Sequence, residues 1–245
     1  MASNPPGPCC FTGFKHEGTP IGVQDSIKGV QTYISRPKDN EKPKAAVIIV
    51  TDVFGVVQNS KLLADDFAAN GYLTLVPDIL DGEFLPLDVF ETGSVDIPGW
   101  ASRHGPEQVD AVLEKVIGHL RNDVGVEKIA AAGYCFGGKY TARFLKAGKL
   151  DVGYTAHPSY ITFEELQSVE KPFSIAAAET DQIFTRELRH KSEDILIANG
   201  TPYQINLFSG VAHGFAVRGD LSKPVNKFSK EQAFLQALAW FDHYL

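Results

Sequence analysis

The segment Gly133 to Gly138, with the sequence GYCFGG, constrains the fold of this chain more than any other. It follows an apolar run at 128–132 that is typical of a short buried strand, and it precedes a helix-forming run at 139–145. A strand that turns directly into a helix needs glycines beside the turning residue, because side chains there would collide. The pattern therefore predicts a nucleophile elbow. Such an elbow presents the Cys135 sulfur at the end of a sheet and beside a helix N-terminus, which favours a thiolate.

Asp181 and His213 follow this cysteine in the chain order of an α/β-hydrolase triad. Asp181 comes just after a small-residue strand predicted at 173–178, and His213 lies in a glycine-framed loop after a strand predicted at 203–208. A nucleophile, an acid and a histidine, each on a loop after a strand, are the groups that acyl transfer needs. We therefore predict that Cys135, Asp181 and His213 form a catalytic triad.

Each of these residues also has a structural interpretation. A glycine-flanked cysteine can be an inert core residue. Asp181 could instead cap the helix that begins near Thr185, which would leave Glu179 as the acid. His157 also ends a predicted strand, and we interpret it as a residue of the pocket wall, with catalysis as the second choice. The remaining histidines are predicted to be surface or helix residues: His16, His104, His119, His190 and His243.

Strands and helices alternate along the rest of the chain. This order predicts a mainly parallel sheet with helices on both faces and a site at the carboxyl ends of the strands. We expect one domain over residues 1–245, with 1–20 as an N-terminal extension. Periodicity fails over 79–105, which predicts a lid or a pocket wall. Further strands are expected at 21–25, 29–35, 45–50, 72–76 and 152–156, and helices at 59–70, 106–121, 185–198 and 229–244.

The net charge of −7 argues against nucleic acid or an anionic membrane as a partner. The sequence has no apolar run long enough to span a bilayer and no signal-peptide pattern at its start, so we expect a cytoplasmic protein. Three cysteines cannot all pair within one chain, which suits a reducing compartment. Cys9 and Cys10 are adjacent, so we expect them to pack as small apolar residues, with a redox role as the alternative.

With these residues in place, the chain resembles the dienelactone hydrolase family of α/β-hydrolases, the carboxymethylenebutenolidases. The resemblance covers the chain from about Gln31 to the C-terminal helix. It is carried by the segments at 133–138, at 212–215 (AHGF) and at 50–55 (VTDVFG). The N-terminal segment at 9–20 resembles the eukaryotic, particularly the fungal, branch of the family.

The resemblance implies a role for each residue of the triad and its surroundings. Cys135 would be the nucleophile, His213 the general base and later the acid, and Asp181 the group that orients the imidazole. The backbone N–H groups of Phe136 and Val53 would hold the oxyanion, because developing negative charge needs fixed donors.

Asp52 stands where the family has a glutamate that contacts the thiol and helps to generate the thiolate. Because the aspartate is one methylene shorter, it could instead hold its loop by accepting backbone N–H bonds; we expect activation. The resemblance also implies that Arg218 binds a substrate carboxylate, with Arg103 as the second choice. The other residues predicted to bind substrate are Phe54, Tyr134 and Trp100.

We therefore predict a cysteine-dependent hydrolase that cleaves an ester or lactone of a small molecule through an acyl enzyme. No metal or organic cofactor is expected, because the triad and the oxyanion hole would supply all the reacting groups. The resemblance favours a small unsaturated lactone that bears a carboxylate. The alternatives are a general carboxylesterase or thioesterase and, from another class, a noncatalytic thiol-sensing binding protein. Either a monomer or a homodimer is expected.

Overall fold

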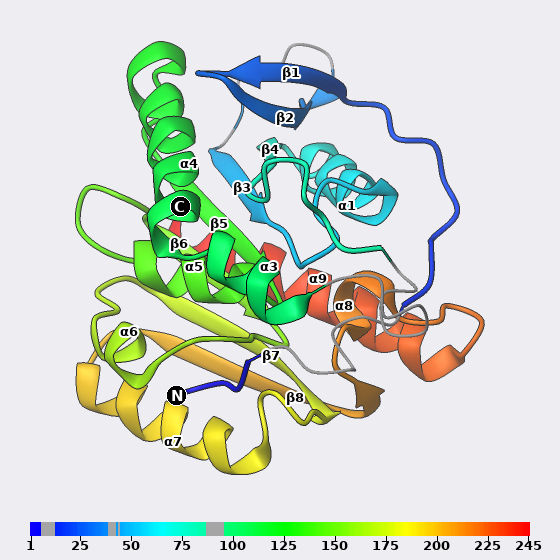
Figure 1. The fold of residues 1–245 in the computed structure, drawn as a ribbon, viewed down its shortest axis with the longest axis vertical. Coiled ribbons are helices and arrows are strands. Elements are labelled where there is room, and N and C mark those ends of the chain that lie inside the picture. Colours follow the sequence, from blue (N-terminus) through cyan, green and yellow to red (C-terminus); the bar gives the residue numbers. More distant parts are fainter. Residues whose placement is uncertain (6–12, 39–42, 44, 87–95) are drawn as a thin grey trace.

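A computed structural model describes residues 1–5, 13–38, 43, 45–86 and 96–245 of the chain. Within these residues the framework is an eight-stranded sheet with the strand order β1-β2-β4-β3-β5-β6-β7-β8 (Figure 1). The hairpin of β1 and β2 is antiparallel, β2 pairs antiparallel with β4, and all later pairs are parallel. The strands span Val23–Ile27 (β1), Val30–Ser35 (β2), Ala46–Val50 (β3), Leu73–Pro77 (β4), Ile129–Tyr134 (β5), Val152–Ala156 (β6), Phe173–Thr180 (β7) and Tyr203–Ala212 (β8). The predicted mainly parallel sheet is confirmed.

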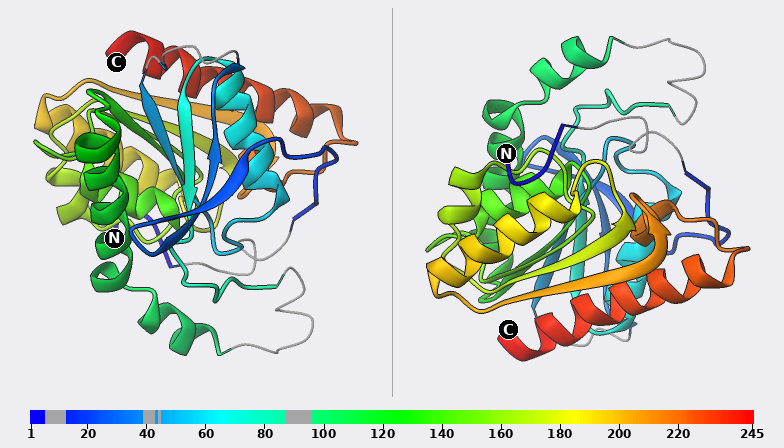
Figure 2. Two further views of the ribbon diagram at one scale, coloured as in Figure 1. Left: turned by 90° about the horizontal axis from the view of Figure 1, so that it is seen from above. Right: turned by 90° about the horizontal axis from the view of Figure 1, so that it is seen from below.

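Helices cover both faces of this sheet, as Figure 2 shows. Helices α1 and α9 pack with Val47 and Ile49 of β3 in one buried apolar cluster. Helices α4 to α7 contribute to the other cluster, which contains Ala46, Ile48 and Val50 of the same strand. The helices span Gln58–Ala69 (α1), Ile97–Arg103 (α3), Pro106–His119 (α4), Gly137–Phe144 (α5), Phe163–Gln167 (α6), Arg186–Asn199 (α7), Phe215–Arg218 (α8) and Pro224–Tyr244 (α9), with a π-helical turn (η3) at Leu120–Val124.

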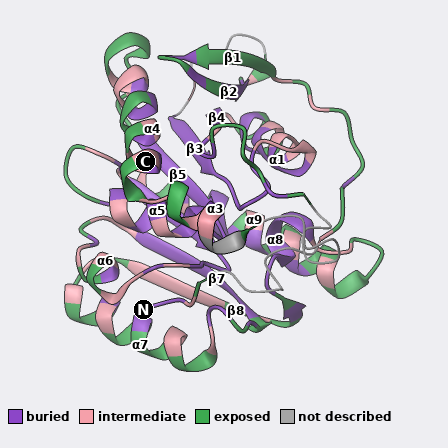
Figure 3. Cartoon of the chain, viewed as in Figure 1, coloured by how far each residue is buried: buried purple, intermediate pink, exposed green. Residues whose placement is uncertain are grey.

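Local sequence explains where these elements begin and end. All five residues of β3 are buried, as expected for an apolar strand covered on both faces, whereas β1 is mostly exposed (Figure 3). Helix α4 begins with Pro106, whose missing N–H costs nothing in a first turn. The Thr185 hydroxyl accepts the N–H of Leu188 and caps α7, which ends at Gly200 in the left-handed conformation.

The structure corrects the expectation of an irregular segment at 79–105. Helix α3 occupies part of it, and residues 87–95 lie outside the described part of the chain. The Trp100 ring is buried and stacks on the His104 ring at a centroid distance of 4.4 Å. This packing supports a short helix that contains a proline and a glycine, so tertiary contacts outweigh the weak local propensity. Helices α6 and α8 were also not predicted.

Two histidines predicted to be surface or helix residues are buried. Both ring nitrogens of His104 lie within hydrogen-bond distance of backbone oxygens, those of Trp100 and Leu80. His16 Nε2 lies 2.9 Å from the Gly219 oxygen. Backbone partners of this kind cannot be read from a local pattern. Cys9 and Cys10 lie outside the described residues, and no helix in the described part has the length and apolar character that crossing a bilayer requires.

Candidate active site

The turn between β5 and α5 has the geometry of a nucleophile elbow. Cys135 has a φ of +50°, a backbone conformation that non-glycine residues rarely adopt. A Cβ on Gly137 would lie 1.9 Å from the Val50 oxygen, and one on Gly133 would lie 2.6 Å from the Gly137 oxygen. The glycines are therefore required by the close approach of the backbone. The Cys135 N–H donates to the Ala156 oxygen at 3.1 Å, which ties the elbow to the end of β6.

The structure brings Cys135, His213 and Asp181 together. His213 Nε2 lies 3.1 Å from the Cys135 sulfur, and His213 Nδ1 lies 2.9 Å from Asp181 Oδ2. Asp181 Oδ1 accepts the backbone N–H groups of Ile183 and Phe184 at 2.8 and 2.9 Å, which holds the carboxylate in place. All three members of the triad are buried. This is the geometry in which a nucleophile, a base and an orienting acid act as one unit.

The electrostatics of the triad favour a charged imidazole. Burial lowers the pKa of His213, but the Cys135 sulfur and the Asp181 carboxylate more than offset this effect and raise the pKa to about 10. The shift favours an imidazolium next to a thiolate. Glu179, the alternative acid, is exposed; its carboxylate accepts the Gly210 N–H and the Ser209 hydroxyl, which lowers its pKa. Of the two acids, Asp181 is the one in contact with the histidine.

The backbone positions of Phe136 and Val53, the predicted oxyanion donors, follow neighbouring strands. Phe136 is the N-cap residue of α5, directly after the elbow. Val53 follows β3, whose residue Val50 is paired in register with Gly133 of β5. Because parallel strands end at the same edge of a sheet, both loops border the elbow.

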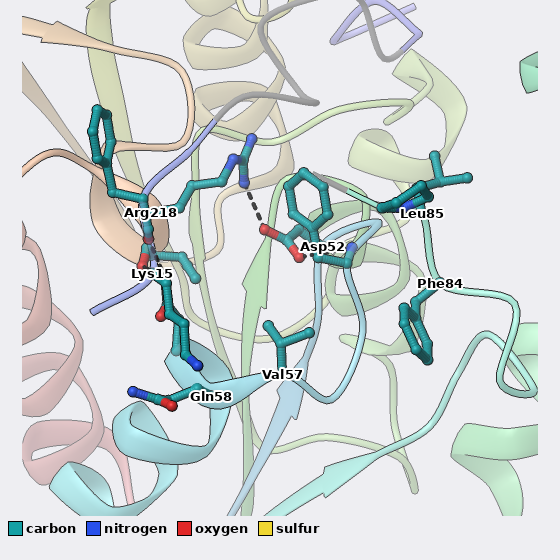
Figure 4. A pocket seen from close by; sticks show the side chains of 12 residues that line it. Lys15, Asp52, Val57, Gln58, Phe84, Leu85 and Arg218 are labelled. Atoms are coloured by element: carbon teal, nitrogen blue, oxygen red, sulfur yellow. Dashed lines mark hydrogen bonds and ion pairs between the residues drawn. The ribbon is translucent and has the colours of Figure 1, made fainter. Parts of the chain in front are cut away.

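Asp52 and Arg218 form a buried ion pair at the same edge of the sheet (Figure 4). Asp52 Oδ2 lies 2.6 Å from an Arg218 guanidinium nitrogen, and Asp52 Oδ1 accepts the Phe54 N–H at 3.1 Å. Burial raises the pKa of Asp52 while the Arg218 charge lowers it, and the nearby Cys135 charge raises it further. The guanidinium also lies over the Phe54 ring, 5.3 Å from its centroid. The sequence did not indicate that Arg218 and Asp52 are partners.

A cavity of about 360 Å³ opens beside this ion pair (Figure 4). Its walls are mainly apolar and aromatic, with the ion pair among the few charged groups. Phe54 and Arg218, two of the residues predicted to bind substrate, line it. The other lining residues come from four segments far apart in the sequence: Phe14, Lys15, Asp52, Val57, Gln58, Asn59, Phe84, Leu85, Pro86 and Val217.

The other predicted substrate-binding residues do not line this cavity. Arg103 is exposed and pairs with Glu83 at 2.9 Å. Trp100 is buried and packs against the Phe136 ring at a centroid distance of 5.6 Å. Tyr134 lies in the core, where its ring packs edge-on against Tyr154 at 6.1 Å. Of these three side chains, Trp100 and Tyr134 thus lie in the core and Arg103 lies at the surface.

Sequence reasoning missed Ser159 as a neighbour of the nucleophile. The Ser159 hydroxyl oxygen lies 3.6 Å from the Cys135 sulfur, and the Ser159 N–H donates to the Cys135 oxygen at 2.9 Å. The serine is buried and follows β6, the strand next to β5. That order could have revealed it, because a loop after the neighbouring strand has to meet the elbow.

His157, predicted to be in the pocket wall, packs directly on His213. Its ring is fully buried and lies edge-on to the His213 ring at a centroid distance of 4.9 Å. Neither of its ring nitrogens has a hydrogen-bond partner among the described residues. Burial, followed by the charges of His213 and Arg218, lowers its pKa well below the ordinary value. His157 is therefore a neutral packing partner of His213.

Comparison with known proteins places the chain in a family. The model of the dienelactone hydrolase family matches residues 30–245. The hydrolase tropI of Talaromyces stipitatus is 44% identical over all of this chain and 99% of its own length, and the hydrolase pyvD of Aspergillus violaceofuscus is equally similar at 44% with the same coverage.

Solved structures agree on the fold. A crystal structure titled as a dienelactone hydrolase, from Klebsiella pneumoniae, has a TM-score of 0.78 at 21% identity and covers 91% of this chain and 99% of its own. At this identity the match supports the α/β-hydrolase fold alone. The match to the family model over residues 30–245 and the two relatives at 44% identity show more than the fold. The chain belongs to the dienelactone hydrolase family, whose members hydrolyse carboxylic ester bonds.

Proposed function

We propose that this protein hydrolyses an ester or lactone of a small molecule through the triad Cys135, His213 and Asp181. The observation that carries the proposal is the continuous contact from sulfur to imidazole to carboxylate, 3.1 and 2.9 Å, within one buried elbow. The thiolate attacks the carbonyl carbon, and the carbonyl electrons move to oxygen. When they return, the carbon–oxygen bond breaks and His213 Nε2 gives its proton to the leaving alkoxide.

The resulting thioester is hydrolysed by the same groups in reverse roles. His213, now neutral, takes a proton from water, and the hydroxide attacks the thioester carbonyl. The carbon–sulfur bond breaks, the acid leaves, and the thiolate and imidazolium are restored. We propose that the N–H groups of Phe136 and Val53 stabilise the oxyanion of both tetrahedral intermediates. The triad and both N–H donors then come from a single chain. We propose that this chain forms one domain.

Arg218 is the proposed anchor for a substrate carboxylate. Its guanidinium borders the cavity and is paired with Asp52, so a substrate carboxylate would compete with Asp52 for it. In molecules whose Cys135 still carries its proton, the released Asp52 carboxylate would accept that proton and so supply the thiolate. This arrangement favours an unsaturated lactone or ester that bears a carboxylate. The cytoplasmic location and the monomeric or dimeric state stay predictions.

A substrate panel tests this function. Activated esters should give a burst of product equal to the enzyme concentration, because the acyl enzyme forms before water releases it. Lactones with and without a carboxylate, aryl esters and thioesters should then be compared by kcat/KM. A noncatalytic binding protein would give no burst and no turnover, and a general esterase would show no preference for the carboxylate.

A further inference from the structure

Residues Gly13 to His16, which we call the strap, are fixed across one side of the cavity. The Phe14 N–H donates to the Arg218 oxygen at 2.9 Å, and the Asn59 amide donates to the Phe14 oxygen at 2.8 Å. The His16 N–H donates to Asn59 Oδ1 at 2.9 Å, and the Gln58 amide donates to the His16 oxygen. The strap is thus bound to both α1 and α8, and every one of these bonds joins residues at least 42 positions apart in the sequence.

The strap covers Arg218 directly. A Cβ on Gly13 would lie 2.5 Å from Arg218 Cδ, so the backbone of Gly13 is in contact with the arginine side chain. On the other side, a Cβ on Gly214 would lie 2.8 Å from Arg218 Cζ. Two glycine backbones therefore enclose the arginine, which explains why a charged side chain that borders a cavity is only 3% exposed.

Phe14 lies between the cavity at the ion pair and a second hollow at the triad. The second hollow measures about 290 Å³ and is lined by residues that include Phe14, Arg218 and His213. Phe14 is 55% exposed, a large apolar surface for a residue whose backbone is held by hydrogen bonds. The first cavity is also lined by the apolar residues Phe54, Phe84 and Leu85. A cavity lined by several aromatic and aliphatic side chains favours a flat apolar group.

We propose that the strap is a fixed wall of the substrate pocket and that Phe14 selects substrates with a planar, apolar group, such as an aromatic ring, next to the reacting ester. This inference rests on the proposed function, since it assigns the part of the substrate that does not react. The strap determines specificity. The triad supplies the chemistry without it.

Binding measurements test the wall without any turnover. Phenylacetate and acetate differ only in the ring, so their dissociation constants, measured by calorimetry, isolate the contribution of the ring. Phe14→Ala should raise the Kd of phenylacetate about 5-fold, the loss expected for one aromatic contact, and leave that of acetate unchanged. Phe228→Ala is the matched control, because Phe228 lies on α9 and is 62% exposed. Equal Kd values of phenylacetate in wild type and Phe14→Ala would overturn the proposal.

Kinetics then separate this proposal from the proposed function. Three esters serve as substrates. Vinyl acetate has no aromatic ring, vinyl benzoate has a ring on the acyl side, and the phenyl ester of acetic acid has a ring on the alcohol side. Phe14→Ala should raise KM about 5-fold for at least one aromatic ester, with kcat and all constants for vinyl acetate unchanged. An equal loss for vinyl acetate would show that Phe14 acts on the triad and would overturn the proposal. If wild type hydrolyses none of the esters but shows the ring-dependent binding, the proposed function fails, whereas the assignment of Phe14 as the pocket wall that binds a ring stands.

Discussion

The triad and the ion pair of Asp52 with Arg218 lie at the same edge of the sheet but are built in different ways. Each residue of the triad follows its own strand, and β5, β7 and β8 belong to one parallel half of the sheet, so these strands end at the same edge. The ion pair joins a loop after β3 to a short helix 166 residues further along the chain, and the strap covers it from the N-terminus. The comparison teaches that the positions of the three triad residues follow from the topology of the sheet. The positions of the pocket residues depend instead on contacts between segments that are distant in the sequence.

Removing the nucleophile should have the largest effect. Cys135→Ala should lower kcat by a factor on the order of 10⁴ or more with the fold unchanged, because only the attacking group is lost. Cys135→Ser should also be poor, since a hydroxyl needs a stronger base than a thiolate site offers. Ester hydrolysis and circular dichroism measure the two effects, with Cys9→Ala and Cys10→Ala as controls that should keep activity. Full activity in Cys135→Ala would break the assignment of the triad.

Loss of the base or of the orienting acid should come next. His213→Ala and Asp181→Asn should each reduce kcat by about 10³- to 10⁴-fold, with the histidine at least as severe because it carries the proton. Glu179→Gln changes the matched acid at the end of β7, two residues before Asp181, and should stay close to wild type. If Glu179→Gln proved the more severe of the two acidic variants, the acid would have to be reassigned.

The pH profile gives a further measure of the same group. The pKa of His213 is raised from 6.5 to about 10, and it is the imidazolium that protonates the leaving group. The basic limb of kcat/KM should therefore fall as pH rises through about 10 and not near 6.5. A basic limb near neutral pH in the wild-type profile would mean that the sulfur and the imidazole do not share charge in this way.

The sequence predicts that Cys135, Asp181 and His213 come together, as they do in the structure, and the physical reason is local. Glycines that flank Cys135, small residues before Asp181 and glycines around His213 all mark the ends of strands, of which β5 is wholly buried and β7 largely buried. Parallel strands then bring these ends together, so the order of residues along the chain was sufficient.

The partners of the residues predicted to bind substrate could not be predicted in the same way. Nothing in the local pattern shows that Arg218 pairs with Asp52, that Arg103 pairs with Glu83 at the surface, or that Tyr134 points into the core. These outcomes depend on which neighbours a side chain meets after folding. Helix α3 was missed for the same reason, since packing of Trp100 and not propensity stabilises it.

Ser159 should show a smaller effect, confined to the thiol. A hydroxyl that donates to the sulfur stabilises the thiolate, so Ser159→Ala should raise the thiol pKa by about one unit and lower the alkylation rate about 10-fold at pH values below that pKa. The pH dependence of Cys135 alkylation by iodoacetamide measures this shift towards higher pH. Ser26→Ala on the exposed β1 strand is the control. An alkylation curve in Ser159→Ala that overlays that of wild type would mean that this serine only holds the elbow through its backbone.

Asp52 should give the smallest change in the chemical step, and it sharpens the comparison because it belongs to both regions. If it activates the thiol once a substrate carboxylate takes its place on Arg218, a carboxylate ligand such as phenylacetate should lower the apparent pKa of Cys135 alkylation in wild type. In Asp52→Asn that response should be lost, with a few-fold drop in kcat/KM, and Asp52→Glu should restore it.

If Asp52 instead serves to hold its loop, the same variants should differ from wild type in thermal stability and not in thiol reactivity. The carboxylate accepts the Phe54 N–H and neutralises a buried arginine, so Asp52→Asn would leave Arg218 buried without its counter-ion. The thermal midpoint would then fall by several degrees while the alkylation profile of the remaining folded protein matched wild type with and without phenylacetate. We expect the ligand-dependent shift, because the Asp52 carboxylate is close enough to the sulfur for the charge on Cys135 to raise the pKa of Asp52. A lowered midpoint with unchanged alkylation profiles would make Asp52 a structural residue and would leave thiol activation to His213 alone.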